Sequence, residues 1–490
     1  MKVAFGEIIL TPPEFLGGYL GKPMAGYTPI PNANGKYDDI KAHAVLIEDT
    51  LLRNIAKRLL LISLDFLKIP LLWSDYVKEK IEERYKIHRN QILLHAIHTH
   101  KSMDMTGEFV FGGGWGGVIK GIVFGTYYGN DKYKIWIAKQ LVKLTGELID
   151  NLKPAEFAYT KKRIDERLIF NRRHPERDSK SDLGVISFRE ISSKEMIGII
   201  VTYGAHPTTL ASFIDKMSAD YPARVIEKIE NLSNKKVKAA FFTGPAGDIN
   251  PITTVDKNID NLSKLPQSEL LKQRGDLPHT KRLGYKIGKY AYELANSLKD
   301  DDYFDKIEFK VYTNTFWVPM RDFIKYKAPF KFQQQLIHWI KRYILFPIAL
   351  VLGDVYEPNF PGFAVKHKGI LHSKSKINIY SQVVLIRIFA SSSKDPNKLP
   401  KELDISGVPG ELFEDIAKEI SLKNPAGPEN TFIFQNSNDW ISYLFPIKEY
   451  ITAGGYEPFA SFSPLCGEFV KFAYFRMLED MKYDIIGGNY

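Results

Sequence analysis

Three of the eleven histidines of this chain lie close together in the stretch LLHAIHTHKSMD, residues 93–104. They are His95, His98 and His100, and an apolar run that predicts a buried strand leads into them. Alternate side chains of an extended backbone share a face, so His98 and His100 should point the same way. Two imidazoles on one face could form half of a metal site, but H-x-H pairs also occur as hydrogen-bonded structural histidines. Further ligands are needed to decide between these two interpretations.

Two later stretches place polar residues after predicted strands. His206 in YGAHPTTL (203–210) precedes a proline, which favours an extended or turn backbone, and it is a candidate third imidazole. A histidine bonded to the backbone at the end of a strand is the alternative. The loop TGPAGDINP (243–251) holds Asp248 among glycines and prolines, a composition that can bring the backbone close to a substrate. Alternatively, Asp248 serves only an Asx-type turn.

Short apolar runs alternate with helical patterns along the first 300 residues. The runs that predict strands are 43–49, 59–67, 91–99, 196–206 and 237–247, and the helical patterns are 73–85, 133–152, 221–232 and 284–298. More strand-like stretches follow at KIEFKVYTNTFWV and SKINIYSQVVLIRIF. This alternation predicts an α/β protein with a mixed β-sheet core and flanking helices, in which strand-end loops build the site.

A hydrophobic insert near 320–360 separates the last two strand-like stretches. Its segment LIHWIKRYILFPIALVLGD (336–354) is uncharged from Tyr343 to Gly353, and Lys341 and Arg342 come just before. The apolar run is too short to span a bilayer. It predicts either a buried helix or hairpin, or an element that covers a pocket and meets lipid.

Composition excludes several classes of protein. A hydrophobic fraction of 44% and a charged fraction of 25% are those of an ordinary globular protein. The net charge of +10 favours anionic surfaces such as acidic membranes, and the chain has no nucleic-acid-binding signature. With Cys466 as its single cysteine, any metal must be held by His, Asp, Glu or Tyr. No cleavable signal is visible at the N-terminus, so we expect a cytoplasmic location with peripheral contact to a membrane.

Six motifs in order resemble those of the neutral, non-lysosomal ceramidases, which are zinc-dependent amidases that release fatty acid from a sphingoid base. The family motifs are T-H-T-H-S-G-P followed by glycines, N-R-S-P, A-V-H-P-T, G-D-V-S-P-N, V-P-G-E and N-x-Y-x-x-Y-x-x-x-x-E-Y. The matching stretches here are IHTHKSMDMTGEFVFGGGWGG (97–117), NRRHP (171–175), GAHPT (204–208), GDINP (247–251), VPGE (408–411) and NDWISYLFPIKEY (438–450), with a second tyrosine motif at YE (456–457). The resemblance covers nearly all of residues 1–490 as one catalytic domain, with no room for the immunoglobulin-like domain of better-known members.

Site residues follow from the resemblance by position. It implies zinc ligands at His98, His206, Glu411 and Tyr443, of which the phenolic oxygen would be an unusual ligand. His100 would donate to the developing oxyanion of the amide. Beyond the ligands and His100, the resemblance implies substrate-side or catalytic roles for Arg172, Tyr456, Asp248 and Asn250.

Asn250 is a departure from the family pattern, because family members carry serine at this position. An asparagine cannot act as a serine-type nucleophile, but it can hydrogen-bond a carbonyl or a water. Lys101, Ser102 and Met103 also replace the S-G-P that follows the histidines, and we expect these residues to shape the site entrance.

The sequence therefore predicts a Zn²⁺-dependent amidase that cleaves an N-acyl lipid or ceramide-like substrate. One alternative is a non-catalytic, lipid-binding relative, which Asn250 would explain. Another is a metal hydrolase with the amidohydrolase barrel, whose sequences also open with H-x-H. The acyl amide itself and the oligomeric state stay open.

Overall fold

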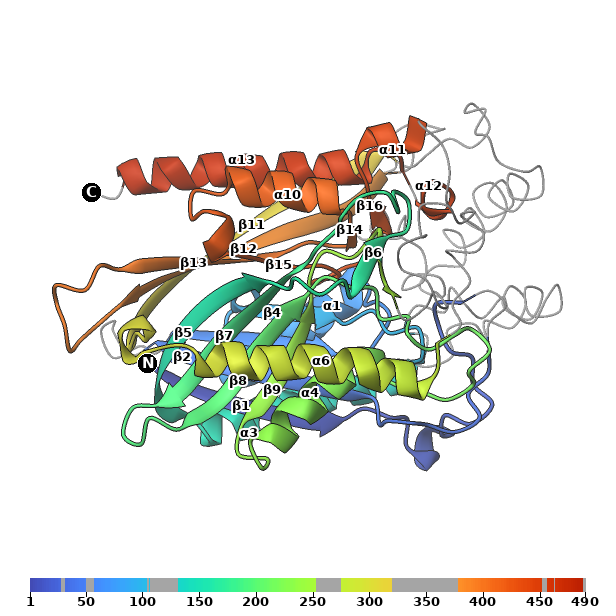
Figure 1. Cartoon of the computed structure of the whole chain (residues 1–490), viewed down its shortest axis with the longest axis horizontal. Coiled ribbons are helices and arrows are strands. Elements are labelled where there is room, and N and C mark those ends of the chain that lie inside the picture. Colours follow the sequence, from blue (N-terminus) through green and yellow to red (C-terminus); the bar gives the residue numbers. More distant parts are fainter. Residues whose placement is uncertain are drawn as a thin grey trace.

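The computed structural model of the chain describes residues 1–27, 31–49, 57–103, 105, 131–252, 275–319, 378–451, 456–461 and 463–487. Two sheets pack face to face at its centre, and helices cover the outer face of each sheet (Figure 1). The predicted mixed α/β class is confirmed. The hydrophobic insert near 320–360, including all of 336–354, lies outside the described residues.

The larger sheet has eight strands in the order β4-β3-β2-β1-β5-β7-β8-β9. The strands are β1 (Lys2–Ile9), β2 (Lys41–Asp49), β3 (Lys57–Leu64), β4 (Ile92–Ala96), β5 (Lys153–Arg163), β7 (Asp182–Glu190), β8 (Met196–Tyr203) and β9 (Lys238–Thr243). Of the seven neighbouring pairs, β3–β4 and β8–β9 are parallel and the other five are antiparallel. This pattern is incompatible with an eight-stranded parallel barrel, so the amidohydrolase alternative is wrong.

The smaller sheet pairs its strands in the order β11-β12-β13-β15. These strands are β11 (Lys306–Pro319), β12 (Asn378–Ser391), β13 (Lys401–Gly407) and β15 (Thr431–Phe434). Successive side chains of a strand point to opposite faces of the sheet, and here both sets are apolar, so each sheet has two apolar faces. In β3, for example, Leu59 and Leu61 face the smaller sheet while Leu60 and Ile62 face helices. The core therefore has three apolar layers rather than one.

Helices cover both outer faces, as Figure 1 shows. The larger sheet is covered by α1 (Leu71–Tyr85), α3 (Asp131–Asp150), α4 (Asp220–Leu232) and α6 (Leu277–Asn296). The smaller sheet is covered by α10 (Glu414–Lys423) and α13 (Cys466–Gly487). Asp276 caps the start of α6 by accepting a hydrogen bond from the backbone N–H of His279.

Short elements gather at one end of the two sheets. They are the paired strands β6 (Ile169–Asn171) and β10 (Ile249–Pro251), the paired strands β14 (Glu411–Leu412) and β16 (Tyr443–Leu444), and the helices α11 (Ile447–Ile451) and α12 (Glu457–Ala460). Single 3-10 turns occur at Glu14–Leu16, Arg89–Gln91, Asp300–Asp302 and Pro428–Asn430. The short strands carry the residues that the motifs single out.

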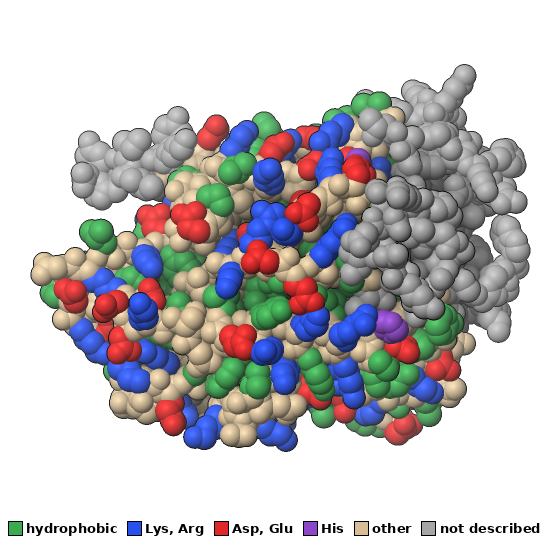
Figure 2. Space-filling view, in the orientation of Figure 1, with side chains coloured by type: hydrophobic (Ala, Val, Ile, Leu, Met, Phe, Trp, Pro, Cys, Tyr) green, Lys and Arg blue, Asp and Glu red, His purple; other side chains and the backbone are tan. Residues whose placement is uncertain are grey.

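The surface gives two observations that bear on the membrane prediction. None of the helices in the described ranges combines the length and the apolar character needed to cross a bilayer. On the face drawn in Figure 2, basic and acidic side chains are interspersed over the described part of the chain.

Candidate metal centre

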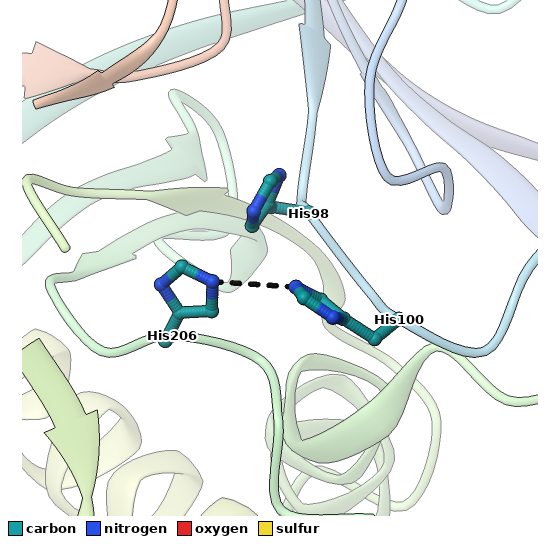
Figure 3. A group of neighbouring side chains, drawn as sticks. All are labelled: His98, His100 and His206. Carbon is teal, nitrogen blue, oxygen red and sulfur yellow. Dashed lines mark hydrogen bonds between the residues drawn. The ribbon is translucent and has the colours of Figure 1, made fainter. Parts of the chain in front are cut away.

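Three buried imidazoles meet where β4 and β8 end. His98, His100 and His206 each offer one ring nitrogen, and these atoms lie within 4.8 Å of one another. Figure 3 shows the three rings turned toward a common point, with His100 Nε2 3.3 Å from His206 Nε2. Thr243, the last residue of β9, helps to hold the ends of β4 and β8 together: β9 pairs with β8, and Thr243 Oγ1 donates to the carbonyl of Ile97 at 2.7 Å. A group of this composition could hold a metal ion.

The predicted reason for the pairing of His98 and His100 is wrong. Strand β4 ends at Ala96, and His98 has a φ of 73°, which is the left-handed region rather than an extended conformation. The ring centroids of His98 and His100 still lie 5.1 Å apart, because a turn rather than a pleat brings them together. His95, by contrast, is a structural histidine whose Nε2 accepts the backbone N–H of Thr243 at 2.9 Å.

The outer nitrogens of two imidazoles are held by backbone carbonyls. His98 Nδ1 lies 2.7 Å from the oxygen of Leu67, and His206 Nδ1 lies 3.0 Å from the oxygen of Ala246. Because a carbonyl only accepts, each Nδ1 must carry the hydrogen. Burial and the charge of Arg172 lower the pKa of His206 well below its ordinary value, so this ring is neutral and its Nε2 presents a lone pair. This orientation is the one that histidine ligands of metals adopt.

Glu411 faces the same point from β14. Its Oε2 lies 3.2 Å from His98 Nε2 and 3.7 Å from His206 Nε2. Among the described residues this buried oxygen has no hydrogen-bond donor. Burial alone would raise the pKa of Glu411, but His98 and Arg172 hold it below its ordinary value, so the carboxylate is ionised. A buried anionic oxygen that faces two imidazole nitrogens needs a positive charge beside it, which either a proton on His98 or a metal ion between the groups can supply.

Tyr443 stands beside Glu411 because β14 and β16 pair in parallel with these two residues in register. Its hydroxyl donates to the hydroxyl of Tyr456 at 3.1 Å. Burial and Glu411 raise the pKa of Tyr443 well above its ordinary value, so the phenol is protonated in the absence of a cation. Tyr456 is 39% exposed, which places it at the rim of the site.

The spacing of these atoms fits a small divalent ion. Zinc bonds to nitrogen and oxygen at about 2.0–2.1 Å, and a tetrahedron of such bonds has edges of about 3.3 Å. The distances of 3.3 Å between His100 and His206, 3.2 Å between His98 and Glu411, and 3.7 Å between His206 and Glu411 lie close to that edge. The unsatisfied Glu411 Oε2 and the neutral His206 supply a donor set of the kind that zinc prefers.

Arg172 and Asn250 lie next to the histidines and hydrogen-bond each other. Arg172 Nη1 donates to Asn250 Oδ1 at 2.9 Å, and both side chains are buried. The other guanidinium donors go to Glu457 Oε1 at 2.8 Å and to the carbonyl of Gly247 at 2.6 Å. The guanidinium carbon also lies 5.3 Å from the ring centroid of Tyr456. Arg172 therefore holds the Asn250 loop and the Tyr456 segment together.

Comparison with known proteins supports the likeness that the motifs predict. A crystal structure of neutral ceramidase from Pseudomonas aeruginosa matches with a TM-score of 0.65 and 16% identity, over 98% of this chain and 74% of that chain. A second structure, "Ceramidase complexed with C2", matches with a TM-score of 0.67 and 15% identity, over 98% of this chain and 75% of that one. The chain has the neutral ceramidase fold. No family model matches the chain, and no curated protein sequence matches it.

Within this ceramidase fold, Asp248 is held by the protein. Its Oδ2 accepts from Asn171 Nδ2 at 2.7 Å, and its Oδ1 accepts the backbone N–H of Glu414 at 3.0 Å. Burial raises the pKa of Asp248 to about 7. Both oxygens bind groups outside the 243–251 loop, one in β6 and one at the start of α10, so these bonds do not form the Asx-type turn of the alternative interpretation.

The residues that replace the family's S-G-P are buried in this ceramidase fold. Lys101 and Ser102 are fully buried and Met103 is nearly so. Lys101 Nζ donates to the carbonyl of Ile214 at 2.6 Å, and it lies 4.7 Å from the ring centroid of Tyr27. Their burial shows that they pack against neighbouring segments, and the expectation that they shape the entrance stays a prediction.

Three further residues join the elements of the site, and the sequence analysis did not single them out. Trp440 Nε1 donates to Glu411 Oε1 at 3.1 Å. Glu457 binds both Arg172 and Arg173. Gln435 Oε1 accepts the backbone N–H groups of Ala246 and Leu412, which ties the His206 side of the site to β14. Trp440 and Glu457 lie inside the matched motifs, whereas nothing in the sequence distinguishes Gln435 from a surface glutamine.

Proposed function

We propose that this protein is a zinc-dependent amidase that hydrolyses the amide bond of an N-acyl lipid, with ceramide-like compounds as the substrate class. The observation that carries the proposal is that the buried His98, His206 and Glu411 face one another, with Tyr443 in register beside Glu411. The neutral ceramidase fold of the chain supports the same reaction class. A lipid amide substrate also suits an enzyme that works at a membrane surface.

Each ligand would come from a different strand end, and the protein orients all of them before any ion arrives. His98 and His206 would bind through Nε2, because their Nδ1 atoms are held by backbone carbonyls. Glu411 would bind through Oε2 and Tyr443 through its hydroxyl oxygen. Bound there, zinc would polarise the amide carbonyl and lower the pKa of a water molecule to about 7.

Tyr456 and His100 are the side chains that we assign to the substrate. Tyr456 Oη accepts the hydroxyl of Tyr443, so its own hydrogen is available to a substrate group at the exposed rim. His100 is our candidate donor to the developing oxyanion, although its Nε2 also lies 3.3 Å from His206 Nε2, within reach of the metal. The zinc content of His100→Ala separates these roles. The variant keeps its zinc if His100 is only a hydrogen-bond donor, and it loses zinc if His100 is a metal ligand.

Asn250 supports a second candidate function, that of a lipid-binding relative without activity. Its Oδ1 is occupied by Arg172, and its amide cannot attack a carbonyl. In the catalytic proposal the attacking group is water, and Asn250 and Arg172 position the substrate carbonyl or that water.

Hydrolysis of a panel of N-acyl amines by zinc-loaded protein tests the proposal. We expect fatty acid release that Glu411→Ala abolishes and that Glu419→Ala leaves unchanged, since Glu419 is half-exposed and bound to Lys471. Zinc-loaded, folded protein that releases no fatty acid from any of these substrates would instead favour the lipid-binding function.

A further inference from the structure

The two carboxylate oxygens of Glu411 have different surroundings. Oε1 accepts a hydrogen bond from the indole N–H of Trp440 at 3.1 Å. Oε2 is buried without a hydrogen-bond donor in the described part of the chain, and it faces the histidine nitrogens at 3.2 and 3.7 Å. The indole therefore determines which oxygen points toward the candidate metal position.

Trp440 is itself fixed on two sides. Its backbone N–H donates to Asp439 Oδ1 at 2.7 Å, and the same carboxylate accepts the backbone N–H of Leu71 and the hydroxyl of Ser381. Lys68 Nζ lies 3.7 Å from the ring centroid of Trp440. A cation over an indole face is attracted by the ring, and it draws electron density from the ring, so the N–H becomes a stronger donor.

The segment Leu67–Lys68 contributes to both sides of the metal position. The carbonyl of Leu67 holds His98 Nδ1 at 2.7 Å, and the next residue, Lys68, packs over Trp440. One pair of neighbouring residues after β3 thereby orients His98 directly and Glu411 through the indole. His98 follows β4 of the larger sheet and Glu411 lies in the β14–β16 pair, so this segment couples the positions of two separate elements.

We propose that Trp440 is a positioning residue that holds Glu411 so that only Oε2 faces the histidines, and that Lys68 strengthens this hydrogen bond. The inference rests on the proposed metal site. Its physical basis is that a carboxylate with both oxygens free can rotate, and fixing one oxygen removes that freedom before the ion binds. Hydrogen bonds that orient a metal ligand typically change metal affinity by about 10–100-fold when they are removed.

Trp440→Phe tests the positioning role, because it keeps a ring beneath Lys68 and removes only the donor. The measurement is the zinc dissociation constant of the full-length protein, obtained by competition with a chelator of known affinity. We expect binding about 10–100-fold weaker than wild type. Trp73→Phe is the matched control, since its buried indole donates to the carbonyl of Lys134 and has no contact with Glu411. The control should bind zinc as wild type does.

The possible outcomes separate a failure of this inference from a failure of the proposed metal site. Wild-type protein that binds no zinc would remove the metal site and this inference together. Zinc binding by Trp440→Phe with wild-type affinity would overturn the inference alone. Equal weakening in Trp440→Phe and Trp73→Phe would also overturn it, because the loss would then reflect general destabilisation.

Lys68→Met provides a second variant that keeps most of the side-chain volume without the charge. We expect it to weaken zinc binding in the wild-type background by a few-fold and to have no further effect in Trp440→Phe. Equal effects of Lys68→Met in both backgrounds would show that Lys68 acts independently of the indole, and would contradict this part of the proposal.

Discussion

Glu411 and Tyr443 are opposite one another in the parallel pair formed by β14 and β16. Side chains in register on neighbouring strands share a face, so this short sheet brings a carboxylate and a phenol from separate motifs to one side. Gln435 connects this pair of strands to the His206 side of the site, because its Oε1 accepts the backbone N–H groups of both Leu412 and Ala246. Two of the proposed ligands are therefore placed by backbone pairing rather than by flexible loops.

Gly26 is predicted to be essential for the position of His100. It has a φ of +111°, and a Cβ atom at this position would lie 2.5 Å from the His100 ring. Gly26→Ala should lower the free energy of unfolding by about 1–3 kcal/mol more than Gly21→Ala, because overpacking adds to backbone strain. Gly21 is the matched control, since it also has positive φ, +71°, but nothing lies within 4 Å of its added Cβ. Chemical denaturation measures both variants, and equal losses would contradict a tight contact at His100.

Asn250→Ser is predicted to raise the hydrolysis of ceramide. The serine hydroxyl restores the group found in the family motif and can still accept from Arg172, whereas the methyl group of Asn250→Ala can do neither. We expect at least about a tenfold difference in kcat/KM between the two variants, equivalent to about 1.4 kcal/mol. Serine and alanine variants of equal activity would show that this loop does not take part in the reaction.

Asp65 is predicted to make stability depend on pH. Burial raises the pKa of Asp65 to about 7, although the backbone N–H of Lys41 donates to it. Since the folded-state pKa lies above the unfolded value, the native state favours the protonated carboxyl. The stabilisation is fully present below the unfolded value, about pH 4, and is lost as pH rises through about 7.

The variant Asp65→Asn lacks this titration, so its stability relative to wild type should increase between pH 4 and 7. The slope approaches about 1.4 kcal/mol per pH unit. Urea denaturation at a series of pH values measures the difference, and Asp178→Asn, at an exposed carboxylate, is the control. Parallel curves for Asp65→Asn and wild type would mean that Asp65 is ionised in the native state throughout.

Periodicity predicted the elements of the fold well. Strands at 43–49 and 196–206 and helices at 73–85 and 133–152 correspond to β2, β8, α1 and α3 within a few residues. The arrangement in two face-to-face sheets was not predictable, because a strand that is apolar on both faces indicates burial without showing what covers each face. Pairing across long sequence separations, as between β1 and β5, leaves no local signal.

The sequence identified the site residues through motifs rather than geometry. It brought together His98, His206, Glu411 and Tyr443; in the structure the first three face one another, and Tyr443 is in register with Glu411. The left-handed backbone of His98 could not be foreseen, because non-glycine residues seldom adopt it. Gln435 and Trp440 were missed for a different reason: their importance comes from hydrogen bonds to residues distant in the sequence.

Zinc content is the most direct test of the central claim that these side chains converge on one ion. Elemental analysis of protein purified without chelators should find about one zinc per chain in wild type. His98→Ala and His206→Ala should lose it, and His88→Ala, at a largely exposed histidine away from the centre, should retain it. Wild-type protein without any divalent metal, or full zinc content in both His98→Ala and His206→Ala, would contradict the account.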